Sequence, residues 1–400
     1  MYTIAYVDRT NISMALPSIS RDLAMDSVQA GNVAGIFFWG YLLLQVPAGY
    51  LANRWSAKRL ISVLLVIWGV CAIGCGLAES YQQIRLMRFL LGMAESGVYP
   101  ATLVLISHWF PRQERALANA LWIICLPLAV VVSSPLSGWI LDRWNWRTMM
   151  IIEGLCPLVW LFVWQIVIHD YPCDAPWLSR SERDYLEKNL TSDAIELAVQ
   201  SPDSSFRALV SPQVLLLSVI CFCRNAADFG FLVWFPTILA DMKRFNNTAI
   251  GGLVAVPFIV GIVSMVIASW HSDKYGERRM HMALTFAIGG FALLLGLLVS
   301  RYSLAASYTF FCLAGVGTYA YLGPFWSIPT ETLSKNIVGP AIGFINGNAN
   351  LGAFVGSIAV GVIRKYTGGF VYGFAMLAVA LLLASGLCFC LKPASLSRAQ

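Results

Sequence analysis

Short polar loops divide the sequence into a series of apolar stretches, most of them about 20 residues long, the length of a helix that spans a bilayer. Hydrophobic residues make up 58% of the chain and charged residues 12%, whereas soluble domains carry roughly 25% charged residues. A membrane-spanning helix satisfies its backbone hydrogen bonds internally, so we predict an all-α integral membrane protein with twelve transmembrane helices. The predicted helices are 1–20, 30–52, 60–78, 82–108, 115–140, 147–169, 211–240, 248–270, 280–299, 303–330, 336–363 and 369–391.

The first apolar stretch is the least typical. Asp8 interrupts it after seven residues, well before a full span is complete, and MYTIAYVDRT lacks the basic start of a signal peptide. We expect that this first helix is truncated and that the true N-terminus lies upstream of Met1.

The basic residues indicate a topology. Fifteen Lys and Arg residues lie in the loops that follow even-numbered helices and in the C-terminal tail, and eight lie in the other loops. The positive-inside rule then predicts that both termini are cytoplasmic. The net charge of +6 is spread over these short loops, so it does not indicate a nucleic-acid surface.

One polar stretch, 171–210, divides the chain into two sets of six helices. Ser179 followed by Glu182 predicts a capping box at the start of an amphipathic helix there. We favour a solvated linker, with a regulatory partner site as the alternative. The predicted domains are an N-terminal bundle (1–170), this linker, a C-terminal bundle (211–391) and a cytoplasmic tail (392–400).

Ionisable residues inside two of the predicted spans are the strongest functional signal. Asp8 and Arg9 lie in the first span, and Arg88 and Glu95 lie on one face of the fourth because seven residues make nearly two helical turns. Such residues are costly in a membrane and normally face a polar interior. We predict that the four line one aqueous cavity that binds a proton and a small anion, with structural ion pairs as the alternative.

A loop motif occurs once in each half. The first copy is GYLANRWSAKR and the second is DKYGERR, 220 residues later. Acidic and basic side chains in such loops can pair in one conformation and separate in another, and duplicated arrangements are typical of transporters with alternating access. The predicted gating residues are Gly49, Asn53, Arg54, Arg59, Asp273, Lys274, Gly276 and Arg278.

Twelve spans, a long central loop and this duplicated motif resemble the major facilitator superfamily over the whole chain. The resemblance implies two pseudo-symmetric six-helix bundles. Asn53, Ser56 and Ser269 depart from the family's motif, which places an acidic residue or a glycine at these positions.

A finer resemblance is to the anion:cation symporter family, which imports sugar acids and other organic carboxylates. It rests on four motifs: YVDRTNI (6–12), Arg88 with Gly92, Glu95 and Pro100, HWFPRQERA (108–116), and Trp146-Arg147 through Gly154. The resemblance implies that Asp8 and Glu95 are the proton-coupling carboxylates and that Arg88 acts with them or with the substrate.

Neutral groups that could contact the substrate lie on several other spans. Besides Arg9 and Arg88, the predicted substrate-binding residues are Tyr6, Tyr41, Gln45, Trp326, Ser327, Asn346 and Asn350. Arg224 and Asp228 have the i, i+4 spacing of a structural pair, with a second anion contact as the alternative. Glu153 and Glu331 fall near helix ends, where we favour interfacial or loop-anchoring roles, with proton coupling as the alternative.

These features predict a secondary transporter that imports a small organic anion with protons across a bacterial inner membrane, functional as a monomer within the lipid bilayer. The alternative is an antiporter or exporter of the same fold. The sequence contains no nucleophile–base set, metal-ligand motif or nucleotide loop in these spans, so we expect no enzymatic activity, no cofactor, no metal and no nucleic-acid partner. The particular carboxylate, the coupling ion and the oligomeric state are left open.

Overall fold

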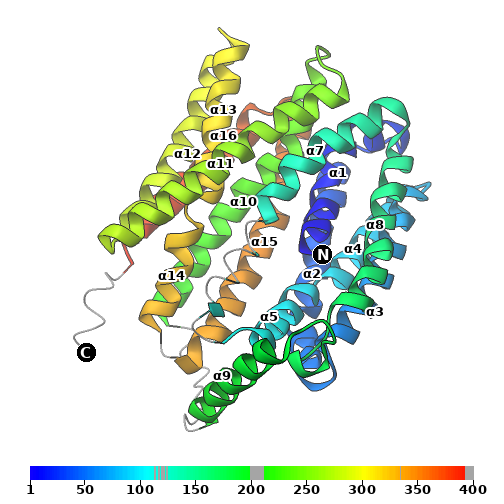
Figure 1. Cartoon of the computed structure of the whole chain (residues 1–400). Coiled ribbons are helices and arrows are strands. Elements are labelled where there is room, and N and C mark those ends of the chain that lie inside the picture. The colour runs from blue at the N-terminus through cyan, green and yellow to red at the C-terminus, as the bar shows by residue number, and fades with distance from the viewer. Residues whose placement is uncertain are drawn as a thin grey trace.

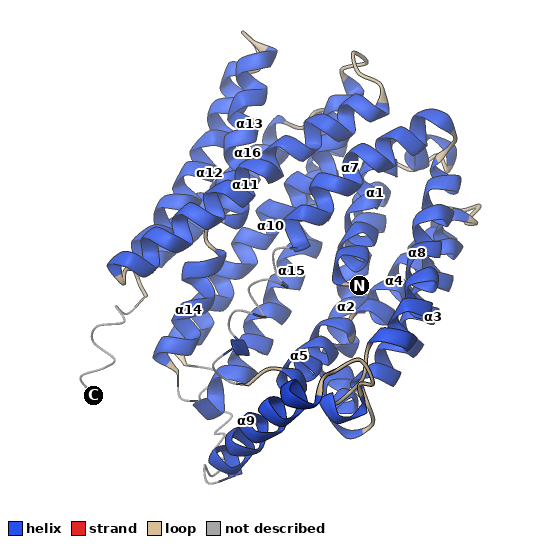
Figure 2. Cartoon of the chain, viewed as in Figure 1, coloured by secondary structure: helices blue, strands red, loops and turns tan. Residues whose placement is uncertain are grey.

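The computed structural model is helical throughout the part of the chain that it describes (Figures 1 and 2). It describes residues 1–111, 114, 115, 118, 122, 125–198, 211–333 and 335–391. The N-terminal helices are α1 (Tyr2–Asp22), α2 (Ser27–Arg54), α3 (Ala57–Gly76), α4 (Tyr81–Glu95), α5 (Val98–Trp109), α7 (Cys125–Arg143), α8 (Trp146–Val167), the short η1 (Pro172–Asp174) and α9 (Arg180–Ala198). They are followed by α10 (Pro212–Asp241), α11 (Asn247–Tyr275), α12 (Arg279–Val299), α13 (Leu304–Tyr319), α14 (Leu322–Thr332), α15 (Lys335–Thr367) and α16 (Val371–Cys388).

Nine helical stretches among the described residues are long and apolar enough to cross a membrane. They are Ser27–Gln45, Ala57–Gly76, Tyr81–Trp109, Cys125–Arg143, Trp146–Val167, Pro212–Asp241, Asn247–Tyr275, Arg279–Val299 and Val371–Cys388. The other three predicted spans correspond to α1, to α13 with α14, and to α15. Buried polar residues lower the hydropathy of α1, and α13 and α14 are each too short to count alone.

Two predicted helices are broken in the structure. The stretch predicted as 82–108 forms α4 and α5 with a turn at 96–97, and 303–330 forms α13 and α14 with a turn at 320–321. Pro100 lies in the first turn of α5, where the missing N–H of proline leaves no hydrogen bond unmade. The predicted helix 115–140 lies partly outside the described residues, and α7 covers its second part.

Glycines permit very close helix crossings in both halves. A Cβ on Gly92 of α4 would lie 2.0 Å from the carbonyl oxygen of Phe37 on α2, and one on Gly40 would lie 2.1 Å from that of Phe89. A Cβ on Gly315 of α13 would lie 1.9 Å from the carbonyl oxygen of Pro257 on α11. Because these contacts are to backbone, a larger residue forces the helices apart.

We expect Gly92→Ala to destabilise the protein by about 1–3 kcal/mol, the usual cost of overpacking a close contact. Gly252 on α11 is the matched control, because a Cβ there meets nothing within 4 Å. Thermal unfolding of the purified protein in detergent measures both variants. Equal stability of Gly92→Ala and Gly252→Ala would contradict this packing.

The two halves meet along three helix pairs, α1 with α10, α2 with α15, and α7 with α11, and Figure 1 shows α7 lying along α11. At one end of these contacts Asp142 of α7 accepts four hydrogen bonds from the backbone and side chains of Asn247 and Thr248, at 2.6–2.9 Å. We call this the Asp142 end. Lys365 also binds Asp26 there at 2.9 Å, and its hydrogen bond lowers the pKa of the Asp26 carboxyl.

The linker contains η1 and α9. Ser179 and Glu182 exchange hydrogen bonds at the start of α9, which confirms the predicted capping box. Residues 199–210 and 392–400 lie outside the described part of the chain. The division into domains stays a prediction.

Candidate functional site

Arg9 of α1 and Glu95 at the end of α4 form a buried ion pair. Nε of Arg9 donates to Oε2 of Glu95 at 2.9 Å, and the two side chains are 7% and 0% exposed. Nη2 of Arg9 and Oε1 of Glu95 have no hydrogen-bond partner in the structure. A buried polar atom without a partner costs free energy, so each side chain retains the capacity to bind a further group.

Asp8 lies in a separate buried network. Its Oδ2 accepts from the indole nitrogen of Trp68 at 2.5 Å, and its Oδ1 accepts from Nδ2 of Asn11 at 3.2 Å. The same amide donates to Glu153 of α8 at 2.7 Å, and Ser137 of α7 donates to the other oxygen of Glu153 at 2.6 Å. Asn11 therefore links two carboxylates from different helices.

The interfacial role expected for Glu153 is wrong, because its side chain is only 4% exposed and is bound inside the N-terminal half. Sequence reasoning ranked a coupling role second for Glu153, so this buried carboxylate is a functional candidate that it underrated. Four apolar residues, 149–152, precede Glu153 two turns into α8, and this was a signal for burial. Glu331, by contrast, has a side chain outside the described part of the structure.

Arg88 binds the backbone of α1 at Asp8. Its Nη1 donates to the backbone carbonyl of Asp8 at 2.8 Å, and its guanidinium lies 5.1 Å from the ring centre of Phe37. Helical spacing predicted that Arg88 and Glu95 share one interior face, and both residues are buried, at 1% and 0% exposed. In this structure, however, the cation bound to Glu95 is Arg9.

A cavity of about 120 Å³ lies between the two halves. It is smaller than the roughly 300–1,000 Å³ of sites for drug-sized ligands, which favours a small solute. Six of the predicted substrate-binding residues line it, namely Tyr6, Arg9, Tyr41, Trp326, Asn346 and Asn350. Larger hollows occur elsewhere, but two of them are lined almost entirely by apolar side chains.

Other predicted residues do not line this cavity. Of the four intramembrane charges expected around it, Asp8, Arg88 and Glu95 are buried behind its wall and Arg9 lines it. The expectation that all four face one cavity is therefore wrong as stated. Gln45 and Ser327 also lie outside the lining, and the hydroxyl of Ser327 donates to the carbonyl of Gly323.

Aromatic rings surround the guanidinium of Arg9. Its central carbon lies 4.4 Å from the ring centre of Tyr41 and 5.5–6.0 Å from those of Tyr2, Tyr6 and Phe37. Ring faces attract a cation without using its N–H donors. Arg9 is thus held in place beside the cavity that it lines, while the hydrogen-bonding capacity of Nη2 is unused among the described residues.

The C-terminal half contributes a second cation. Arg224 of α10 lines the cavity and binds Asp228 one turn further along, with 3.0 Å between Nη2 and Oδ2. The spacing predicted this pair. It did not show that the arginine reaches the same cavity as Arg9, which depends on how the halves meet.

The first loop motif is tied to the end of the N-terminal half. Ser56 and the backbone N–H of Lys58 both donate to Asp170, at 2.5 and 2.9 Å, so Asp170 supplies a carboxylate to the start of α3. Arg54 lies over the ring of Tyr50 at 4.9 Å, and a Cβ on Gly49 would lie 3.3 Å from Pro100. Arg59 is exposed, and the side chain of Asn53 lies outside what the structure describes.

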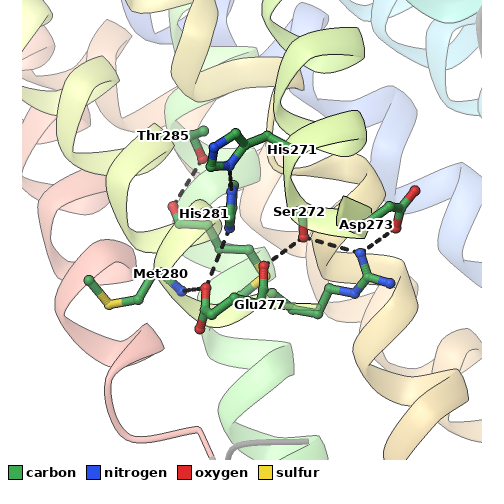
Figure 3. Close-up of polar contacts among 9 residues, drawn as sticks. His271, Ser272, Asp273, Glu277, Met280, His281 and Thr285 are labelled. Atoms are coloured by element: carbon green, nitrogen blue, oxygen red, sulfur yellow. Dashed lines mark hydrogen bonds and ion pairs between the residues drawn. The ribbon is translucent and has the colours of Figure 1, made fainter. Parts of the chain in front are cut away.

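Residues of the second loop motif, between α11 and α12, bind one another (Figure 3). Arg278 binds Asp273 and the hydroxyl of Ser272, and Lys274 lies 5.3 Å from the ring centre of Trp270. Gly276 ends α11 with φ of 65°, a left-handed conformation that favours glycine. Figure 3 also shows the rings of His271 and His281 pointing toward one another, with 2.6 Å between their nitrogens.

Comparisons with known proteins agree with this helical architecture over most of the chain. A family model described as the Major Facilitator Superfamily matches residues 1–357. A protein named "Putative tartrate transporter" from Agrobacterium vitis is 33% identical over 96% of this chain and 86% of its own length. A quinolone resistance transporter of Acinetobacter baumannii is 29% identical over 96% and 89%. Among solved structures, a bacterial homologue of the human lysosomal transporter Spinster, inward-facing and occupied, has a TM-score of 0.78 at 18% identity over 99% and 95%.

The fold and the family match are those of a multi-pass membrane transporter and not of an enzyme. The chain belongs to the major facilitator superfamily. This confirms the predicted fold class of an all-α membrane protein with twelve transmembrane helices, since the described helices match solved transporters of this fold.

Proposed function

We propose that this protein imports a small organic carboxylate together with protons across a bacterial inner membrane. The observation that carries the proposal is Arg9, which binds Glu95 through Nε, lines the cavity, and keeps one amino group, Nη2, without a partner among the described residues. A guanidinium with free donors matches the planar geometry of a carboxylate. The Agrobacterium vitis relative named for tartrate supports an organic acid as the substrate class.

Coupling follows from competition for Arg9. When a substrate carboxylate binds Arg9, Glu95 loses part of its charge compensation in a buried site, and a buried lone carboxylate favours its protonated form. Anion binding and proton binding are therefore linked with the same sign, which is the condition for symport. Asp8, held by Trp68 and by Asn11, is the second proposed proton-coupling carboxylate, a relay that exchanges its proton with Glu95 and adds none to the number carried.

The supporting residues have separable roles in this scheme. Arg88 positions the backbone of α1 at Asp8 rather than contacting the substrate. Tyr6, Tyr41, Trp326, Asn346 and Asn350 supply an aromatic wall and neutral hydrogen-bond partners around the anion. Carbohydrate-like acids need both kinds of contact.

Uptake into right-side-out membrane vesicles tests the proposal. A panel of radiolabelled hydroxy acids is presented with and without an imposed inward proton gradient. We expect at least one acid to accumulate only when the gradient is present. If gradient-driven uptake is absent across the panel and the vesicles instead expel lipophilic compounds, the protein is an exporter, a second candidate favoured by its similarity to the quinolone resistance transporter.

Alternating access requires one end of the bundle to open as the other closes. With the positive-inside orientation, which places both termini in the cytoplasm, the Asp142 end faces the periplasm. We propose that its hydrogen bonds hold the inward-facing state and break when the transporter faces outward. The loop motifs around Arg54 and Asp273 lie at the opposite end and are the proposed cytoplasmic gate.

We expect Asp142→Ala to shift the protein toward the outward-open state by about 1–3 kcal/mol, or roughly 5–150-fold. A cysteine introduced at Ser20, which lines a hollow between the halves at this end, should then react faster with an impermeant maleimide. Asp22→Ala is the matched control, because Asp22 binds Trp146 and Arg147 within the N-terminal half. Equal labelling rates in the two variants would show that Asp142 does not hold the ends together.

A further inference from the structure

The ion pair between Arg224 and Asp228 has features that a purely structural pair lacks. Both side chains are buried, at 7% and 2% exposed, yet Nε of Arg224 and Oδ1 of Asp228 have no hydrogen-bond partner in the part of the chain that the structure describes. The guanidinium lies 4.5 Å from the ring centre of Tyr321 and also donates to Asn225 and to the carbonyl of Thr318. It is therefore fixed in position while part of its hydrogen-bonding capacity is unused.

This second pair resembles the pair of Arg9 and Glu95 in its design. In each pair an arginine lies against aromatic rings, binds one buried carboxylate, and retains an unpartnered nitrogen. The two arginines come from opposite halves, from α1 and α10, and both line the same cavity of about 120 Å³. A short molecule in that cavity can reach both cations at once.

We infer that Arg224 is a second anion-binding residue and that the preferred substrate carries two anionic groups, one bound by Arg9 and one by Arg224. The inference rests on the proposed function and extends it to the substrate's charge. A dianion that bridges α1 and α10 also holds the two halves together. Substrate binding would thus favour a state in which the cavity is enclosed, as alternating access requires.

The buried charges then set the number of protons. When both pairs are ionised, Arg9, Glu95, Arg224 and Asp228 sum to zero. A bound dianion adds two negative charges in a site where uncompensated charge is costly. Protonation of Glu95 and of Asp228 restores neutrality, so we expect two protons to accompany each dianion.

Asp228 has few other groups to compensate its charge. The titratable and charged side chains that act on it are Arg224 on its own helix, Tyr6 of α1, Tyr319 at the end of α13, and Tyr321 in the turn before α14. The hydroxyls of Tyr6 and Tyr319 lie 3.3 Å apart across the two halves. Arg224 is the cation that pairs with Asp228 in the structure. When a substrate carboxylate binds Arg224, a proton on Asp228 takes the place of that charge compensation.

The experiment compares two acids with the same four-carbon hydroxylated chain, tartrate with two carboxylates and threonate with one, in proteoliposomes. We expect the wild type to prefer tartrate at least about tenfold, the discrimination that one buried polar contact supplies. Reversal potentials of uptake should give two protons for each tartrate and one for each threonate.

The variant is the double substitution Arg224→Gln with Asp228→Asn, which keeps both side-chain shapes and leaves no lone buried charge. It should lose the preference for tartrate, and its proton count for tartrate should fall to one. Asp22→Asn with Arg147→Gln is the control, since it neutralises a surface pair outside the cavity. A double variant that keeps the tartrate preference and two protons overturns the inference but leaves the proposed function standing. A wild type that takes up both acids equally well, with one proton each, also overturns the inference alone, whereas the absence of gradient-driven uptake across the whole panel of hydroxy acids overturns both.

Discussion

Glu95→Gln is expected to abolish proton-driven uptake and to spare exchange of substrate across the membrane. The glutamine keeps the shape of the side chain and can still accept a hydrogen bond from Arg9, but it cannot gain or lose a proton. Because no bound proton is needed to neutralise the substrate-loaded site, net uptake should no longer respond to a proton gradient. Loss of the coupling carboxylate should lower gradient-driven accumulation at least about a hundredfold, the lower range for removing a positioned proton-transfer group.

The control is Glu79→Gln, an exposed carboxylate just before α4 that lies far along the helix from the cavity. It should accumulate substrate as the wild type does. Counterflow of labelled substrate against unlabelled substrate inside vesicles measures exchange separately from net uptake. If uptake by the Glu95→Gln variant still followed the pH gradient, the coupling scheme would have no basis.

Arg9→Lys is expected to reduce substrate affinity strongly although it preserves the charge. Lysine is a single ammonium on a flexible chain, whereas the arginine fork binds Glu95 through Nε and keeps a second donor, Nη2, unused at a residue that lines the cavity. A lysine that binds Glu95 therefore has no second edge for the substrate. We expect a loss of about 2–5 kcal/mol in binding, the usual cost of removing one partner of a buried charged contact.

The Michaelis constant for uptake should rise at saturating proton gradient, with a smaller change in the maximal rate. Arg21→Lys is the matched control, because Arg21 lies in the last turn of the same helix and is exposed. If Arg9→Lys and Arg21→Lys had equal Michaelis constants, Arg9 would be a structural cation rather than a substrate contact.

Much of the site could be recognised from the sequence because charge inside an apolar helix is rare and costly. Asp8, Arg9, Arg88 and Glu95 were identified on that ground, and all four are buried in the structure. Helical spacing also identified Arg224 with Asp228, and the duplicated loops indicated two related halves. These signals are local, so they can be read from neighbouring residues alone.

The partners of these charges could not be read in the same way. Glu95 binds Arg9, 86 residues away, rather than Arg88 on its own helix, because the close crossing at Gly92 and the position of α1 decide which guanidinium reaches it. Glu153 joined the site only through Asn11 and Ser137, which lie on two other helices. Tyr41 and Gln45 were both predicted to bind the substrate, but of these two residues of α2 it is Tyr41 that lines the cavity.

The sequence by itself determined that this chain spans a membrane many times and carries ionisable groups inside its spans, because hydropathy and the cost of buried charge are properties of each segment. Tertiary structure alone decided that Arg9 and Arg224 share one cavity while Arg88 lies behind its wall. The reason is physical: a helix fixes which of its own residues share a face, but the packing of two halves fixes which faces meet.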